Sequence, residues 1–100
     1  MRVDELITSF TERIKEDMGV ALTPDRDEEL KTYARAQIDT LSTLVDQAGY
    51  ERAVEATGDL ILMRAMMLAY DEARETDERS RANVVEWLNL IARVIVTFAL

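Results

Sequence analysis

The positions of three glycines and one proline constrain the fold of this chain more than any other feature of its sequence. Between these helix-breaking residues, apolar side chains recur at spacings of three and four, which is the period of an amphipathic α-helix. Gly19 and Gly49 each follow such a stretch, where glycine can adopt the left-handed conformation that ends a helix. Thr23 and Pro24 suit the start of the next helix, with threonine as the N-cap and proline in the first turn. The chain is therefore predicted to be all-α.

A chain of 100 residues has the common size of one domain, and we expect a single helical domain over 1–100. The predicted fold is a four-helix up-down bundle with helices over about 3–18, 24–48, 50–75 and 80–99. Gly58 falls inside the third helix, where glycine costs about 1 kcal/mol relative to alanine, and indicates either a close helix crossing or a break. The polar residues 71–83 leave a second alternative open. Either a turn near 76–80 separates the last two helices, or one continuous helix forms an elongated dimer.

The composition excludes several classes of chemistry, because the chain contains neither cysteine nor histidine. Disulfides, thiolate nucleophiles, cysteine-type zinc sites and serine–histidine catalytic arrangements are all excluded, so that any chemistry falls to carboxylates. Twenty acidic residues against twelve basic ones give a net charge of −8, and the basic residues are scattered singly. A surface that binds nucleic-acid phosphates has to be locally basic, so we expect no nucleic-acid partner.

The two ends of the chain predict neither a signal peptide nor a membrane helix. Asp4 and Glu5 lie where a signal peptide would carry its basic segment. The apolar stretch 84–100 is interrupted by the charged residues Glu86 and Arg93, which are costly in a bilayer. We therefore expect a cytoplasmic protein with no membrane partner.

The third and fourth helices carry more apolar surface than one small bundle normally encloses. Residues 60–70 are apolar at every position except Arg64, and apolar residues also spread around most of the fourth helix. Each helix of a bundle usually keeps one side in water, so the surplus predicts a homodimer, the commonest soluble oligomer, through these two helices. The interface is predicted to contain Leu60, Met63, Met66, Met67, Tyr70, Trp87, Leu88, Ile91, Ile95 and Phe98.

Two alternatives account for the same surplus. The third helix could be central and wrapped by the other three, or the methionines and Trp87 could line a pocket for small apolar ligands.

The interface prediction has consequences for mutants. Met67→Glu or Ile95→Glu is expected to dissociate or unfold the protein, whereas Glu12→Ala on the outer face of the first helix is expected to be nearly silent.

Rows of carboxylates on the third helix are the only candidate metal ligands. Glu51, Glu55 and Asp59 lie at i, i+4 and i+8, which places them on one helix face. Oxygen ligands of this kind suit Mg²⁺, although a solvated charged face explains the same pattern without a metal. A second acidic row consists of Glu72, Glu75 and Glu78.

The segment Gly58-Asp59-Leu60-Ile61-Leu62 resembles part of the all-α nucleotide pyrophosphohydrolases of the MazG type, which are helical dimers or tetramers that use carboxylates and Mg²⁺. In that family a glutamate lies three residues before the aspartate, but here Ala56 occupies that position and Glu55 is displaced by one. The paired glutamates of the preceding helix are also missing, since Ala34, Gln37 and Asp39 occupy that region. The resemblance implies the helical fold and a dimer rather than the activity.

Together these features predict a non-enzymatic, homo-oligomeric helical protein that works through protein–protein interaction and needs no cofactor. Its expected partner is a second copy of itself, with another protein as a further possible partner of its acidic surface. One alternative is a Mg²⁺-dependent nucleotide pyrophosphohydrolase-like protein, and the other is a binder of small apolar ligands.

Overall fold

The computed structural model describes residues 3–70 and 78–99, and within these ranges the chain consists of four α-helices without a strand. The helices are α1 (Val3–Met18), α2 (Pro24–Ser42), α3 (Tyr50–Tyr70) and α4 (Glu78–Ala99). The radius of gyration is 12.9 Å, close to the value of about 13 Å expected for a compact domain of 100 residues. The predictions of an all-α fold and of four helices are confirmed.

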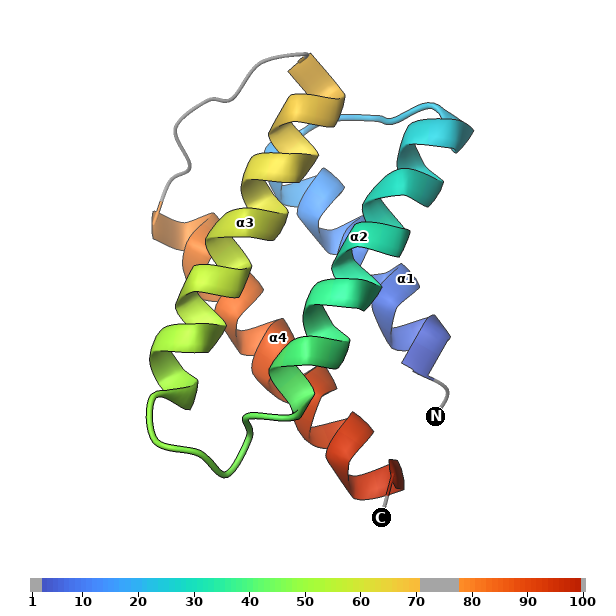
Figure 1. Cartoon of the computed structure of the whole chain (residues 1–100). Helices are drawn as coiled ribbons and strands as arrows, with labels where there is room; N and C mark the ends of the chain where they lie inside the picture. The colour runs from blue at the N-terminus through green and yellow to red at the C-terminus, as the bar shows by residue number, and fades with distance from the viewer. Residues whose placement is uncertain (1–2, 71–77, 100) are drawn as a thin grey trace.

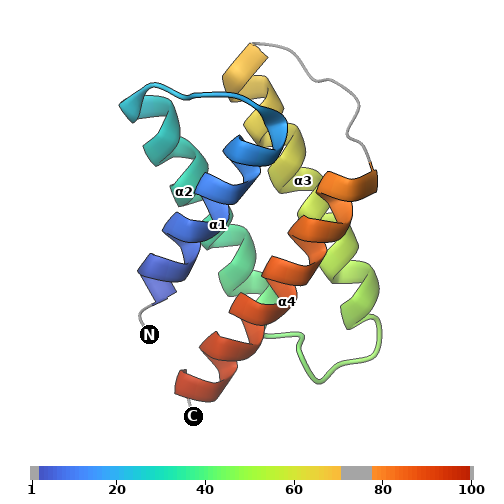
Figure 2. The same cartoon turned by 180° about the vertical axis from the view of Figure 1, so that it is seen from behind.

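The four helices pack as two layers that cross at an angle. In Figure 1 α2 and α3 lie in front of α1 and α4, and the view from behind in Figure 2 shows the reverse. Helix α4 packs against all three other helices, whereas α1 and α3 barely meet. Helix α3 lies in one layer of the molecule and helix α4 in the other.

Side chains from every helix meet between the two layers. Those with almost no exposed surface include Phe10 and Ile14 from α1, Leu30, Ile38 and Leu41 from α2, Ile61 and Leu62 from α3, and Leu88 and Ile91 from α4. Each such side chain contributes about 1.5–3 kcal/mol when it leaves water. One chain thus builds a continuous core of its own.

The connection between α1 and α2 has the predicted capping structure. Gly19 adopts the left-handed conformation with φ of 68°, and the Val20 N–H donates to the Lys15 carbonyl at 3.0 Å, as in a Schellman motif. At the start of α2, the Thr23 hydroxyl oxygen accepts a hydrogen bond from the Arg26 N–H at 3.4 Å. Both helix ends are fixed by interactions within a few residues of the chain.

Helix α2 ends at Ser42, so the prediction that it continues to residue 48 is wrong. The hydroxyls of Ser42 and Thr43 each donate to a carbonyl three residues earlier, at 2.7 Å in both cases. Such side-chain bonds compete with continuation of the helical ladder. Residues 43–49 form turns instead, and Val45 still reaches the core from this segment.

Helix α3 passes through Gly58 without a break, and the glycine marks a close helix crossing. A methyl carbon at Gly58 would lie 3.1 Å from Val84 Cγ1 and 3.5 Å from Leu88 Cδ1 of α4. Because α3 is one helix from Tyr50 to Tyr70, the alternative of a break at Gly58 is wrong. Because α3 and α4 pack against each other within one chain, the alternative of one continuous helix is wrong as well. Helix α4 begins at Glu78, two residues before the predicted start, and the predicted third-helix segment 71–75 lies outside the described residues.

Candidate functional site

The outer face of α3 carries a row of exposed apolar side chains, which we call the α3 stripe: Ala56, Leu60, Met63 and Met67. The spacing of four, three and four residues places them on one side of the helix. Leu60 is 45% exposed, and Met63 and Met67 are each 48% exposed. Surface helices of globular proteins normally present polar residues on this side. The α3 stripe is therefore an apolar surface that the chain's own fold leaves in water.

The opposite side of α3 explains why the stripe remains. Ile61, Leu62, Ala65 and Met66 lie between the two layers, and each is at most 5% exposed. A helix that is apolar on every side can bury only the faces that meet α2 and α4, so its third side stays exposed. The surplus of apolar residues predicted for this helix is thus present on the monomer surface.

The structure divides eight of the ten predicted interface residues into three groups. Leu60, Met63 and Met67 are exposed, whereas Met66, Leu88 and Ile91 are buried in the chain's own core and have no surface to offer a partner. Trp87 and Ile95 are partly buried and pack against that core. The side chains of Tyr70 and Phe98 lie outside the described residues. Helix α4 therefore has less free apolar surface than its sequence predicts.

The predicted metal ligands on α3 lie on the surface. Glu51 and Glu55 are exposed and Asp59 is half-buried, each about one helical turn from the next. Among residues 3–70 and 78–99, no group of three or more acidic side chains could hold a metal ion. The second acidic row, Glu72, Glu75 and the Glu78 side chain, falls outside the described part.

A second partly apolar surface lies on the outer side of α4 beside α1, and we call it the α4 groove. It has a volume of about 610 Å³, and Trp87 and Leu90 form its apolar part. Leu90 is 50% exposed, while Trp87 packs its ring 6.4 Å from that of Phe10. The remaining lining residues are polar or charged: Arg13, Asn83, Glu86, Asn89 and Arg93. Sequence reasoning did not single out this surface, because Arg13 reaches it from a distant part of the chain.

A hydrogen-bonded group fixes one end of the α4 groove. The Tyr50 hydroxyl donates to Asn89 Oδ1 at 2.8 Å, and Arg93 Nε donates to the same oxygen at 3.0 Å. The Arg93 guanidinium also lies 5.6 Å from the centre of the Tyr50 ring. Burial raises the pKa of Tyr50 above its usual value, so the ring carries a neutral hydroxyl donor at physiological pH. This group ties the start of α3 to α4.

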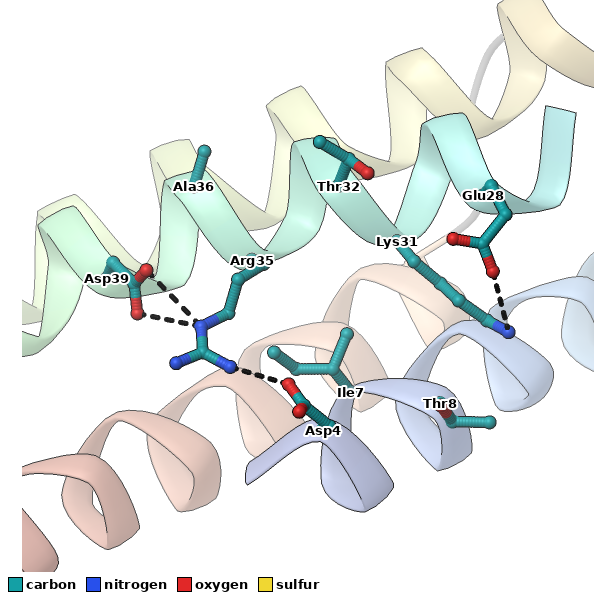
Figure 3. Close-up of a pocket in the computed structure, with 9 residues that line it drawn as sticks. All are labelled: Asp4, Ile7, Thr8, Glu28, Lys31, Thr32, Arg35, Ala36 and Asp39. Atoms are coloured by element: carbon teal, nitrogen blue, oxygen red, sulfur yellow. Dashed lines mark hydrogen bonds and ion pairs between the residues drawn. The ribbon is translucent and has the colours of Figure 1, made fainter. Parts of the chain in front are cut away.

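A third concave surface, of about 500 Å³, lies between α1 and α2 (Figure 3). Arg35 donates from Nε to Asp39 at 3.0 Å and from one terminal nitrogen to Asp4 at 2.7 Å. Lys31 lies 4.0 Å from Glu28. The two cations of this groove are thus paired with carboxylates of the protein itself, and one of the pairs joins α1 to α2.

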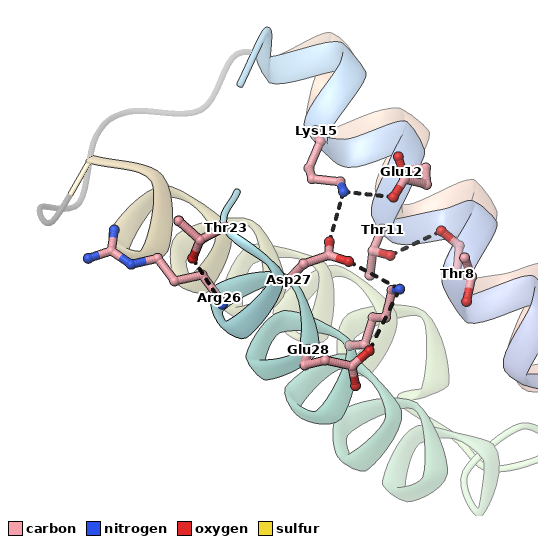
Figure 4. Close-up of polar contacts among 9 residues, drawn as sticks. Thr8, Thr11, Glu12, Lys15, Thr23, Arg26, Asp27 and Glu28 are labelled. Atoms are coloured by element: carbon pink, nitrogen blue, oxygen red, sulfur yellow. Dashed lines mark hydrogen bonds and ion pairs between the residues drawn. The ribbon is translucent and has the colours of Figure 1, made fainter. Parts of the chain in front are cut away.

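The same two helices share a less exposed ion pair further along their contact (Figure 4). Lys15 Nζ lies 2.8 Å from Asp27 Oδ1, and the two side chains are only 15% and 17% exposed. Lys31 adds a contact of 3.1 Å to the other oxygen of Asp27. Desolvation alone would raise the pKa of Asp27, but the hydrogen bonds from the two lysines outweigh it and lower that pKa below 3.8. We call the set of ion pairs between these helices the α1–α2 seam.

Comparisons of the chain with models of protein families, with curated proteins and with solved structures find no match. The resemblance of residues 58–62 to the MazG-type pyrophosphohydrolases has no support from these comparisons. Within the described part of the chain, no helix is both long enough and apolar enough to cross a membrane.

Proposed function

We propose that this protein is a non-enzymatic helical interaction protein that self-associates through the α3 stripe. The observation that carries the proposal is the exposure of Leu60, Met63 and Met67, each close to half, on one face of one helix. Contiguous exposed apolar side chains mark contact surfaces in soluble proteins, and apolar anchors at helical spacing suit packing against another protein. Methionine adapts its shape to such contacts because its side chain is unbranched and flexible.

The expected strength of the association follows from the exposed surface. Burying the remaining half of a large apolar side chain contributes about 1 kcal/mol, so three side chains on each of two subunits contribute about 6 kcal/mol. Association itself costs about 4–15 kcal/mol in lost freedom of movement. We therefore expect a folded monomer in reversible equilibrium with an oligomer. Leu88 and Ile91 lie inside the monomer and add nothing to this estimate.

Two further features of the proposal concern topology and location. The connections between α1 and α2 and between α2 and α3 are short, which supports an up-down order of the helices. A chain without cysteine suits the reducing cytoplasm, where we place the protein.

The test is the absolute mass in solution, measured by light scattering behind a sizing column over a wide range of loading concentrations. The mass of the wild-type chain is expected to rise with concentration, and Met67→Glu is expected to hold the protein at the mass of one chain. Leu44→Glu is the matched control, because Leu44 is 36% exposed but lies in the turn after α2. A wild-type protein that stays monomeric at every concentration would overturn the proposal.

The nucleotide-hydrolase alternative is tested separately. Mg²⁺ with a panel of nucleoside triphosphates is expected to leave the melting temperature unchanged, because the described carboxylates include no group that could hold a metal ion. A rise of several degrees that Glu55→Gln abolishes would favour the hydrolase and count against a purely structural role.

A further inference from the structure

The thioethers of five methionines hold all the sulfur in this chain, because it contains no cysteine. A hydroperoxide converts methionine to its sulfoxide, and exposed positions are the most susceptible because the oxidant has to reach the sulfur atom. With no thiol in the chain to compete for the oxidant, the exposure of each methionine decides which part of the protein a peroxide modifies.

Two methionines of the α3 stripe stand out among the four that the structure describes. Met63 and Met67 are each 48% exposed and lie about one turn apart on the same side of α3. Met66, which lies between them in the sequence, is 5% exposed and belongs to the core side of the helix. Met18 is partly buried and packs against the core. A peroxide in solution therefore reaches the two sulfur atoms of the stripe, while the core shields that of Met66.

The surroundings of Met63 and Met67 make a sulfoxide costly only when the stripe is covered. Sulfoxidation turns a flexible apolar side chain into a polar one and disrupts methionine-rich contacts. In the monomer the new oxygen is hydrated, because both side chains are half exposed. The other side chains of the stripe carry no hydrogen-bond donor, and Arg64 at its edge is held 4.6 Å from the centre of the Tyr33 ring. Because burying an acceptor without a donor is unfavourable, oxidation disfavours association and leaves the fold intact.

We propose that Met63 and Met67 are sites of reversible oxidation, and that their sulfoxides weaken self-association through the α3 stripe. This inference rests on the proposed function, because it requires that the stripe be buried in the oligomer. In the forward step the O–O bond of a hydroperoxide breaks and one oxygen bonds to the methionine sulfur. The sulfur gives up two electrons, and the peroxide is reduced to an alcohol or to water. Methionine sulfoxide reductases reverse the step with two electrons from a pair of thiols, which become a disulfide as the oxygen leaves in water.

The first experiment maps the oxidised positions. The full chain is treated with hydrogen peroxide at a protein concentration where light scattering finds a monomer, and peptide mass spectrometry with fragment-ion assignment follows each methionine over time. Met63 and Met67 are expected to be oxidised about tenfold faster than Met66. The same reaction in urea is the control, because unfolding exposes all three and is expected to make their rates equal. Equal rates in the folded protein would overturn the proposal.

The second experiment measures the association of protein that is oxidised at Met63 and Met67 but not at Met66. Light scattering is expected to show that association requires at least about tenfold more protein, while circular dichroism shows an unchanged helical signal. Reduction by methionine sulfoxide reductases is expected to restore the association. The double variant Met63→Leu/Met67→Leu is the matched control, because leucine is apolar, has a similar volume and contains no sulfur. It is expected to associate equally before and after the same peroxide treatment.

Each other outcome overturns one of the two proposals. If the untreated wild type stays monomeric at every concentration, the proposed function fails before any oxidation. If the untreated and the oxidised wild type associate equally well, the proposed function stands and the oxidation inference is wrong. The inference is also wrong if peroxide dissociates the double variant or if the oxidised wild type loses its helical signal. The single variants Met63→Leu and Met67→Leu replace the double variant if it does not associate untreated, and each is expected to lose part of the sensitivity to peroxide.

Discussion

The α1–α2 seam and the outer face of α3 are both surface regions of the same small bundle, yet they are built from opposite kinds of side chain. The seam joins two helices by ion pairs between Lys15 and Asp27 and between Arg35 and Asp4. The α3 stripe carries half-exposed leucine and methionine with no covering element from the described chain. The seam satisfies its own charges within one molecule, whereas the stripe can lower its free energy only by leaving water.

This contrast separates interactions that maintain the fold from a surface available to a partner. Exposed ion pairs contribute little to stability, typically below 1 kcal/mol, and the pair of Lys15 with Asp27 is the least exposed one in the seam. Burying an apolar side chain stabilises the fold more than an exposed ion pair does, and most of the apolar side chains are already buried in the core. Changes to α3 are therefore expected to separate stability from association, while changes to the seam affect stability alone.

The largest effect is expected on the free energy of unfolding when Met66 of α3 is replaced, and the adjacent Met67 provides the comparison. Met66 is 5% exposed and Met67 is 48% exposed. Met66→Glu buries an unpaired charge and is expected to destabilise the fold by about 3–5 kcal/mol, whereas Met67→Glu is expected to change only the association. Thermal unfolding followed by circular dichroism, compared with light scattering, measures the two effects. Equal loss of stability in both variants would contradict the assignment of inner and outer faces.

The contact between α3 and α4 is tested at Gly58. Gly58→Leu is expected to destabilise the fold by about 1–3 kcal/mol, because a methyl carbon at this position would already lie 3.1 Å from Val84 Cγ1. Gly58→Ala is the control, since its gain in helix propensity of about 1 kcal/mol offsets part of the crowding. Urea unfolding measures both. An unchanged stability of Gly58→Leu would mean that the two helices do not cross closely there.

The seam is expected to respond to acid. Because the pKa of Asp27 is lowered in the folded protein, its contribution to stability is complete above its unfolded value of about 3.8 and is lost as the pH falls through the lower folded value. Asp27→Asn is therefore expected to lower the free energy of unfolding by on the order of 1 kcal/mol at pH 7. Below pH 4 the free energies of unfolding of the variant and the wild type are expected to become more similar. Thermal unfolding of both proteins between pH 7 and pH 2 measures this difference. A gap that is constant with pH would contradict the role of the ion pair.

The smallest effect is expected beside the seam, at the ion pair that Glu12 forms with Lys15 within α1. Glu12 is 58% exposed and lies 2.7 Å from Lys15. Glu12→Ala is expected to change stability by less than about 0.5 kcal/mol, because an exposed pair three residues apart on a helix is weak and Lys15 keeps Asp27. It serves as the background against which the Asp27 variant is judged in urea unfolding. A loss of more than 1 kcal/mol would show that the seam acts as one coupled network.

Much of the fold could be predicted because its signals are local. Gly19 and Thr23 set the turn between α1 and α2 through hydrogen bonds that span a few residues. The predicted end of α2 is wrong because the helical spacing of apolar residues continues to residue 48. The hydroxyls of Ser42 and Thr43 bond to backbone carbonyls, and the helix ends earlier. The α4 groove could not be predicted, because Arg13 and Trp87 are 74 positions apart and meet only when α1 packs on α4.

The sequence alone determined that the chain is helical and that residues 60–70 are apolar on every side of a helix, and it left Gly58 open between a close crossing and a break. These properties depend on side-chain size, backbone freedom and spacing, all of which are encoded over a few turns. Only the tertiary structure decided that Met66 enters the core while Met67 stays in water, and that Leu88 and Ile91 are enclosed by one chain. A helix has no single inner face when all its faces are apolar. The choice is made by the neighbouring helices that cover it.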